Sequence, residues 1–191
     1  MQNISFKSKI RAVDSDTFYL LTKKIGEKNF VKYPWTIKES VLSEKAYTKN
    51  VFDCTTCGIT DGEKVLFMHL CPTRHENKNF NIISEFIESS IKNLNSKFGL
   101  QGFILGGQKT KDKLSENLLN NIISFLNKHN IPLSIFKFGD GLFHTAYFAD
   151  KDEWLIASNQ ITSKMTQENS GEDILKKMFS EVKISEYDEL A

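Results

Sequence analysis

Apolar residues recur along this chain with two different periods. Residues 81–98 and 112–129 carry apolar side chains three or four positions apart, which predicts two amphipathic helices. Residues 55–60 and 64–70 are short runs of β-branched and apolar residues, and such runs favour strands. Further strands are expected at residues 102–105, 133–138, 142–149 and 153–157.

The part of the chain before these elements also predicts mainly β structure. Strands are expected at residues 4–6, 10–13, 17–21 and 29–33, with a turn at Asp14-Ser15-Asp16. Thr36 and Glu39 have the spacing of a capping box, in which two side chains satisfy the free amides of a helix start. We therefore expect a short helix over residues 36–46.

The last part of the chain becomes polar over residues 158–169, which predicts a loop. Ser170 can cap a final amphipathic helix. The apolar face of that helix would contain Ile174, Leu175, Met178, Phe179 and Val182. Together these elements predict an α/β (α+β) fold in a single domain over residues 1–191, with mixed sheets packed under helices.

The candidate chemistry lies in the hairpin predicted around Asp61-Gly62, a dipeptide that strongly favours a two-residue turn. A turn at these residues places Cys54 directly opposite His69. Opposed residues of an antiparallel pair have Cβ atoms about 4.5–5.5 Å apart on one face of the sheet. Cys57 then lies on the other face, opposite Leu66.

A thiol beside an imidazole is the smallest arrangement that supports nucleophilic cysteine catalysis. Cys54 is the candidate nucleophile, Cys57 the alternative nucleophile and His69 the candidate base. Thr48 is the polar residue expected to orient His69. His144 is a reserve base. Because cysteine is among the most often buried residue types, an inert core thiol is the competing interpretation.

Zinc binding is another interpretation, since Cys54, Cys57, His69 and Cys71 could supply four ligands. The three cysteines do not indicate a disulfide framework, so we expect a reducing compartment: the cytoplasm, or a host cytosol reached by a secreted effector. The formal net charge of +1 gives no argument for binding nucleic acid or an anionic membrane. No stretch approaches the roughly 18 consecutive apolar residues of a membrane-spanning helix.

The pattern Thr48-x5-Cys54, then a hairpin, then His69 resembles the cysteine-dependent protein glutamine deamidases. This group includes the chemotaxis receptor deamidase CheD and the cytotoxic necrotizing factor toxins. In the toxins two threonines follow the nucleophile, as Thr55 and Thr56 do here. The interval of 15 positions between Cys54 and His69 is also similar to the family's. Two further similarities are Pro72 shortly after the histidine and the strand end Gly102-Phe103-Ile104-Leu105-Gly106-Gly107.

The resemblance implies a β-sandwich flanked by helices, and hydrolysis of a glutamine side-chain amide in a protein substrate without cofactor or metal. In this family's mechanism Cys54 attacks the amide, His69 moves the proton and Thr48 orients His69. Backbone amides at Thr55 or Asp53 are the candidate oxyanion donors. The implied protein is a toxin or effector that modifies a host regulatory protein, or alternatively a CheD-like chemoreceptor deamidase. Transfer of the acyl group to an amine is an alternative to hydrolysis.

The residues before the nucleophile differ from the family's small residues, because Val51-Phe52-Asp53 precede Cys54. A carboxylate beside the nucleophile opposes thiolate formation if it points inward. A non-catalytic binding module on the same fold is therefore the alternative from another functional class. Gln108, which follows the glycines of the strand end, is expected to face the site.

Overall fold

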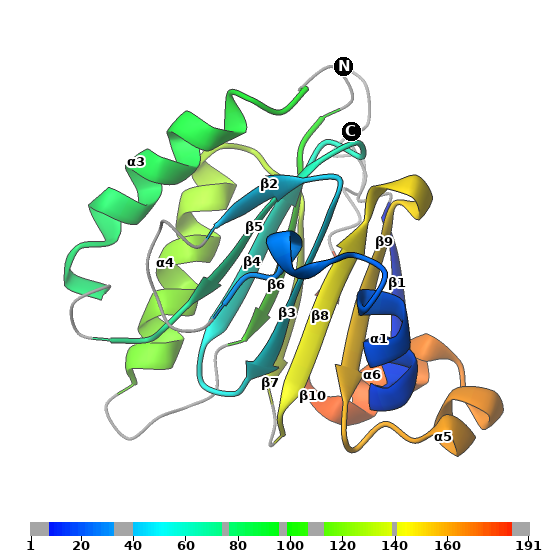
Figure 1. Ribbon diagram of the computed structural model, residues 1–191. Helices are drawn as coiled ribbons and strands as arrows, with labels where there is room; N and C mark the ends of the chain where they lie inside the picture. The colour runs from blue at the N-terminus through cyan, green and yellow to red at the C-terminus, as the bar shows by residue number, and fades with distance from the viewer. Residues whose placement is uncertain are drawn as a thin grey trace, which may run out of the picture.

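The computed structural model describes residues 8–32, 40–73, 77–95, 99–106, 113–138 and 141–184. Two mixed β-sheets pack face to face (Figure 1). The four-stranded sheet has the order β1 (Lys9–Asp14), β9 (Glu153–Ser158), β8 (Phe143–Phe148) and β3 (Lys45–Val51). The six-stranded sheet has the order β10 (Phe179–Ile184), β7 (Leu133–Phe138), β6 (Gln101–Gly106), β4 (Thr55–Thr60), β5 (Val65–Leu70) and β2 (Val41–Ser43). Neighbouring strands run antiparallel except for the parallel pairs β1 with β9 and β6 with β7.

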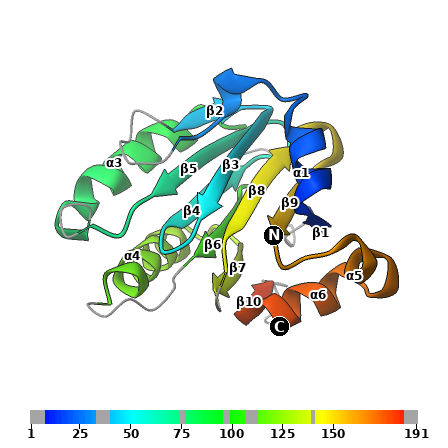
Figure 2. The same cartoon turned by 60° about the horizontal axis from the view of Figure 1, so that its bottom comes forward.

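Helices cover the outer faces of both sheets, as Figures 1 and 2 show from two directions. The six-stranded sheet is covered by α3 (Phe80–Ile91) and α4 (Leu114–Lys128), and the four-stranded sheet by α1 (Ser15–Thr22). The short helices are η1 (Glu27–Asn29), η4 (Ala149–Lys151), α5 (Ser163–Glu168) and α6 (Gly171–Met178). Within the described ranges, no helix combines the length and apolar character needed to cross a membrane.

Trp154 fills the centre of the core between the two sheets. Its ring stacks on Phe103 with ring centroids 4.3 Å apart and on Phe67 with centroids 5.7 Å apart. Gly58 of β4 lies directly beneath this ring, and a Cβ atom added at Gly58 would collide with it. The missing side chain at Gly58 therefore lets an indole from one sheet lie flat against the other.

The mixed α/β class predicted from the sequence is confirmed. Most of the other predicted elements are also present, namely the hairpin β4–β5, helices α3 and α4, and strands β1 and β6 to β9. Helix α3 ends at Ile91, earlier than the predicted end at residue 98. The predicted strand at residues 4–6 lies outside the described residues.

The strand predicted at residues 17–21 is wrong, because these residues belong to helix α1. The Asp14 carboxylate accepts hydrogen bonds from the backbone N–H and the hydroxyl of Thr17, both at 2.9 Å. The segment predicted as a turn, Asp14-Ser15-Asp16, is thus the capped start of a helix.

Two predictions around residues 29–46 also need correction. In the described part of residues 29–33, the predicted strand is reduced to one isolated bridge between Phe30 and Tyr47. The helix predicted over residues 36–46 is replaced, from Val41 onward, by β2 and the start of β3. The two residues of the expected capping box lie outside the described residues. Pairing of β2 with β5 and of β3 with β8 satisfies the backbone hydrogen-bonding groups of these residues. The spacing of residues in the local sequence does not reveal these pairings.

The C-terminal prediction is correct only for its helix start. Residues 158–169 contain the short helix α5, capped by the Thr162 hydroxyl, rather than a loop throughout. The final helix α6 ends at Met178, and the predicted helix residues Phe179 and Val182 belong to β10. β10 pairs with β7 at the edge of the six-stranded sheet. This pairing ends helix α6 at Met178, although the apolar pattern alone would extend the helix.

The hairpin register predicted from the sequence is wrong by two residues. Thr56 lies opposite His69, at the position expected for Cys54. Because side chains alternate with a period of two, a shift of two residues leaves each side chain on its predicted face.

The cause of the register shift is the side chain of Asp61. Its Oδ1 accepts the backbone N–H groups of Glu63 at 2.8 Å and Lys64 at 2.7 Å. The Asp61 N–H donates to the Lys64 carbonyl at 3.3 Å, so these two residues close the turn. The loop is therefore Gly62-Glu63, and Gly62 adopts a φ of +90°, which favours glycine.

Candidate functional site

A hydrogen bond between Thr48 and His69 joins the two sheets. Thr48 lies on β3 of the four-stranded sheet and His69 on β5 of the six-stranded sheet. Both side chains are buried, and Thr48 Oγ1 lies 2.7 Å from His69 Nδ1. The structure therefore brings together the candidate base and the residue expected to orient it.

A second contact of Thr48 fixes the proton positions in this pair. The Thr48 hydroxyl donates to the Val31 carbonyl oxygen at 2.7 Å. A hydroxyl has only one proton to donate, so His69 Nδ1 must carry a proton and donate it to Thr48 Oγ1. Nε2 is then the ring nitrogen with the lone pair. Val31, which has no signal in the sequence pattern, is held in place by its own N–H bond to the Tyr47 carbonyl at 2.9 Å.

The His69 ring is uncharged at neutral pH. Its side chain is 4% exposed, and burial lowers the pKa of His69 to about 4. A neutral imidazole with its lone pair on Nε2 is the form that acts as a general base.

Cys54 lies in the bend that leads into β4. The first residue of that strand, Thr55, pairs with Leu70, and continuing this register places Cys54 opposite Cys71 rather than His69. Cys54 and His69 become diagonal neighbours on one face, a relation that separates residues by about 7–8 Å. The Cys54 side chain is 3% exposed and belongs to the core between the sheets.

Cys57, the alternative nucleophile, lies on the opposite face of β4. It is buried among residues of α3 and α4, and it pairs with Met68 rather than with the predicted Leu66. Burial raises the pKa of Cys57 to about 12. The four residues considered as zinc ligands therefore do not surround one point. In the part of the chain that is described, no group of three or more His, Cys, Asp or Glu side chains could hold a metal ion.

The surroundings of Cys54 favour its protonated thiol. A hydrogen bond with the Cys71 thiol is the first cause that raises the pKa of Cys54, followed by burial and by the nearby Asp53 carboxylate. Asp53 Oδ1 lies 3.7 Å from Cys54 Sγ. The acidic residue noted in the sequence thus lies against the sulfur, and Cys71 is a neighbour that the predicted register did not place there.

Two contacts hold the backbone on either side of Cys54. Ser115, at the start of α4, donates its hydroxyl to the Asp53 carbonyl at 2.6 Å. Gly106 ends β6 so close to the same segment that a Cβ atom there would lie 2.6 Å from the Cys54 carbonyl oxygen and 2.7 Å from Thr55 Cα. Only glycine fits at the end of β6, and its close approach helps to fix the candidate nucleophile.

Two hydroxyl groups without an assigned role in the sequence pattern lie beside the Thr48–His69 pair. Thr56 is paired with His69, and Thr145 of β8 is paired with Thr48. Both are buried, and among the described residues neither Oγ1 atom has a hydrogen-bond partner. A buried hydroxyl without a partner costs free energy, so these atoms are candidate ligands for polar atoms of a substrate. Gln108, expected to face the site, lies outside the described residues.

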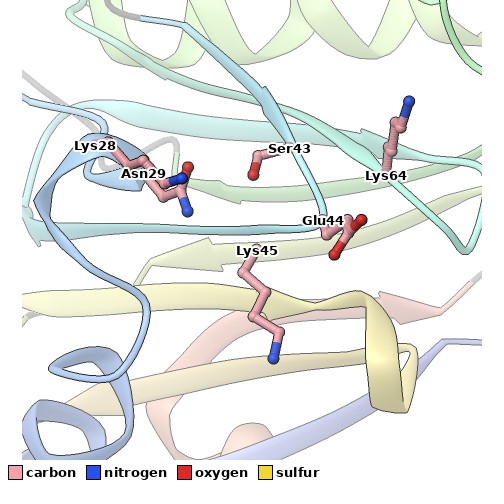
Figure 3. A pocket seen from close by; sticks show the side chains of 6 residues that line it. All are labelled: Lys28, Asn29, Ser43, Glu44, Lys45 and Lys64. Carbon is pink, nitrogen blue, oxygen red and sulfur yellow. The ribbon is translucent and has the colours of Figure 1, made fainter.

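A separate hollow of about 370 Å³ includes Lys64, beside the hairpin turn, and does not include Cys54 in its lining (Figure 3). Its lysine side chains point in different directions, and Lys45 Nζ is bound to Asp150 Oδ2 at 3.3 Å. The lining residues are Lys28, Asn29, Ser43, Glu44, Lys45 and Lys64. The cationic groups do not converge, so this hollow lacks the arrangement of an anion site.

We expect mild treatment with hydrogen peroxide to join Cys54 to Cys71. The more exposed Cys71 would be oxidised to a sulfenic acid, and the Cys54 sulfur would displace water from it. Overall, two thiols lose their hydrogens and one peroxide is reduced to two waters. Peptide mass mapping without reductant should find the Cys54–Cys71 linkage and a free Cys57. In the Cys71→Ser variant no linkage should form, and a bond between Cys54 and Cys57 in the native protein would contradict the register of the β4–β5 hairpin.

No protein-family model and no curated protein matches this chain. The function must therefore be argued from the site itself. That site offers a buried thiol, an uncharged imidazole of defined tautomer, a hydroxyl that orients the imidazole, and two further hydroxyls nearby.

Proposed function

We propose that this protein is a cysteine-dependent protein glutamine deamidase. The observation that carries the proposal is the hydrogen bond from His69 Nδ1 to Thr48 Oγ1, which directs the basic Nε2 away from Thr48. Cys54 shares the inward face of the β4–β5 hairpin with His69, one diagonal step away. The Thr/Cys/His pattern of the sequence supports the same chemistry.

The reaction begins with Cys54 as a thiol, because its neighbours raise its pKa. His69 Nε2 accepts the thiol proton as the sulfur attacks the carboxamide carbon of glutamine. The C–N bond then breaks, and the imidazolium returns the proton to the departing ammonia. Water, deprotonated by His69, hydrolyses the thioester and leaves glutamate. Backbone N–H groups at Thr55 or Asp53 are the proposed donors to the oxyanion.

The product differs from the substrate by one negative charge, which suits a regulatory change in a protein partner better than a metabolic step. A toxin or effector acting in a host cytosol is the first proposal for its role. A CheD-like chemoreceptor deamidase is the second.

Mass spectrometry of a cytosolic extract that has been incubated with the purified protein tests the proposed function. The purified protein is incubated with a cytosolic extract in water enriched in heavy oxygen, and glutamine-containing peptides are searched for conversion to glutamate. We expect one or a few glutamines to gain heavy oxygen with the native protein and none with the His69→Gln variant. A parallel reaction with a primary amine detects transamidation. Equal patterns with native protein and variant in both reactions would reject the proposal.

A non-catalytic binding module is the second candidate function, and the contacts of Cys54 with Cys71 and Asp53 favour it. A diazoketone analogue of glutamine separates the two candidates. An active site would attach this reagent to Cys54 in native protein but not in the His69→Gln variant. A binding module would leave Cys54 unlabelled in both.

A further inference from the structure

Strand β3 contains a bulge directly after Thr48. Thr48 pairs with Thr145, but the next paired residue of the strand is Val51, opposite Phe143. Two residues of β3, Lys49 and Asn50, therefore occupy the space of one residue in β8. Asn50 adopts a φ of +59°, the left-handed conformation that asparagine tolerates better than most residues.

The bulge determines on which face of the sheet the side chains between Thr48 and Cys54 lie. In a regular strand, side chains three positions apart lie on opposite faces, so an inward Thr48 would turn Val51 outward. In this structure Val51 is fully buried in the core between the sheets, the same core that contains Cys54. Because of the extra residue, Thr48 and Val51 of the same strand both face the core, and the chain then continues to Cys54.

His144 holds the bulge from the opposite face of the four-stranded sheet. Its Nδ1 accepts the Asn50 backbone N–H at 3.1 Å, and the extra residue of a bulge commonly leaves such an amide without a ladder partner. The imidazole is 3% exposed and packs against the rings of Phe18 and Tyr19 in α1, each with centroids 5.5 Å away. The reserve base of the sequence analysis therefore points away from Cys54.

The acceptor role of His144 requires an uncharged ring. Burial, with a further contribution from the positive charge of Lys49, lowers the pKa of His144 to about 4. At neutral pH the lone pair of Nδ1 is therefore available to Asn50, and Nε2 carries the proton.

We propose that His144 is a positioning residue: by accepting the Asn50 N–H it keeps the β3 bulge in the form that presents Cys54 to the Thr48–His69 pair. The proposed effect of His144 on the position of Cys54 depends only on the fold. The proposed effect of His144 on the reaction rate rests on the proposed deamidase function.

Two substitutions test this role. His144→Leu introduces an apolar side chain of similar size and removes the acceptor, whereas His144→Asn places an oxygen near the position of Nδ1. The first readout is the rate at which peroxide joins Cys54 to Cys71, because it reports the position of Cys54 without any substrate. The second readout is kcat for a glutamine substrate. A third variant, Ile87→Val in α3, loses stability on the far side of the six-stranded sheet and serves as the matched control.

We expect His144→Leu to lower both rates by about tenfold to a hundredfold, as small misplacements of reacting groups do. His144→Asn should restore most of each rate, and Ile87→Val should leave both near the native value. The proposal is overturned if His144→Leu joins the two cysteines at the native rate, or if His144→Asn fails to improve on His144→Leu. If the native protein hydrolyses no glutamine but the cross-linking rates differ as expected, the proposed function fails and the positioning role stands.

Discussion

Replacing Cys54 by alanine is expected to lower the rate of glutamine hydrolysis on the order of 10⁴- to 10⁶-fold, the range seen when enzymes lose a nucleophile or its partner. Without the sulfur no thioester can form, and the neutral His69 has no thiol proton to accept. Release of ammonia at saturating substrate measures this loss. The small, buried side chain can be removed with limited effect on folding, which thermal unfolding of the variant verifies.

The other two cysteines supply the controls for this experiment. Cys57→Ala should keep nearly full activity, because Cys57 lies on the far face of β4. Cys71→Ala should keep or raise activity, since it removes the hydrogen bond that is the main cause of the raised pKa of Cys54. Loss of activity in Cys71→Ala together with normal activity in Cys54→Ala would instead identify Cys71 as the nucleophile.

The parts of the fold that could be predicted are those in which one local signal decides. Helices α3 and α4 have long apolar stripes, and the hairpin has two runs of β-branched and apolar residues on either side of Asp61-Gly62. The failures occur where a single contact outweighs the pattern. The apolar run at residues 17–21 favours a strand by composition, but the cap at Asp14 makes it a helix.

The candidate site residues could be predicted because two of them belong to one hairpin and the third lies a few positions before it. The resemblance to the deamidases indicated Thr48 as the partner of His69, although nothing in the local pattern shows that the two belong to different sheets. Val31 and Ser115 have no recognisable sequence signal, because each takes part in a hydrogen bond between a side-chain hydroxyl and a main-chain carbonyl of a segment distant in sequence. Cys71 was considered only as a zinc ligand, and its place opposite Cys54 was not predicted because Asp61 shifts the hairpin register.

The second large effect expected is a loss of stability between pH 7 and pH 5, caused by the two buried histidines. Burial lowers the pKa of both His69 and His144 from the ordinary value of 6.5 to about 4. Between these values the unfolded chain binds more protons than the folded protein, so the free energy of unfolding falls as the pH is lowered and recovers as it is raised. The loss by pH 5 is about 2 kcal/mol for each histidine, or about 4 kcal/mol together.

Urea unfolding at the two pH values measures this loss directly. His144→Asn should remove about half of the difference between pH 7 and pH 5, because an asparagine does not titrate, and His69→Gln should remove a similar share. His69 lies between the two sheets and His144 on the outer face of the four-stranded sheet, so their contributions should add. A native difference that persists unchanged in both variants would show that other groups cause the acid sensitivity. A reduction in His144→Asn alone would mean that His69 has the same pKa in the folded and the unfolded chain, which would contradict a pKa lowered by burial.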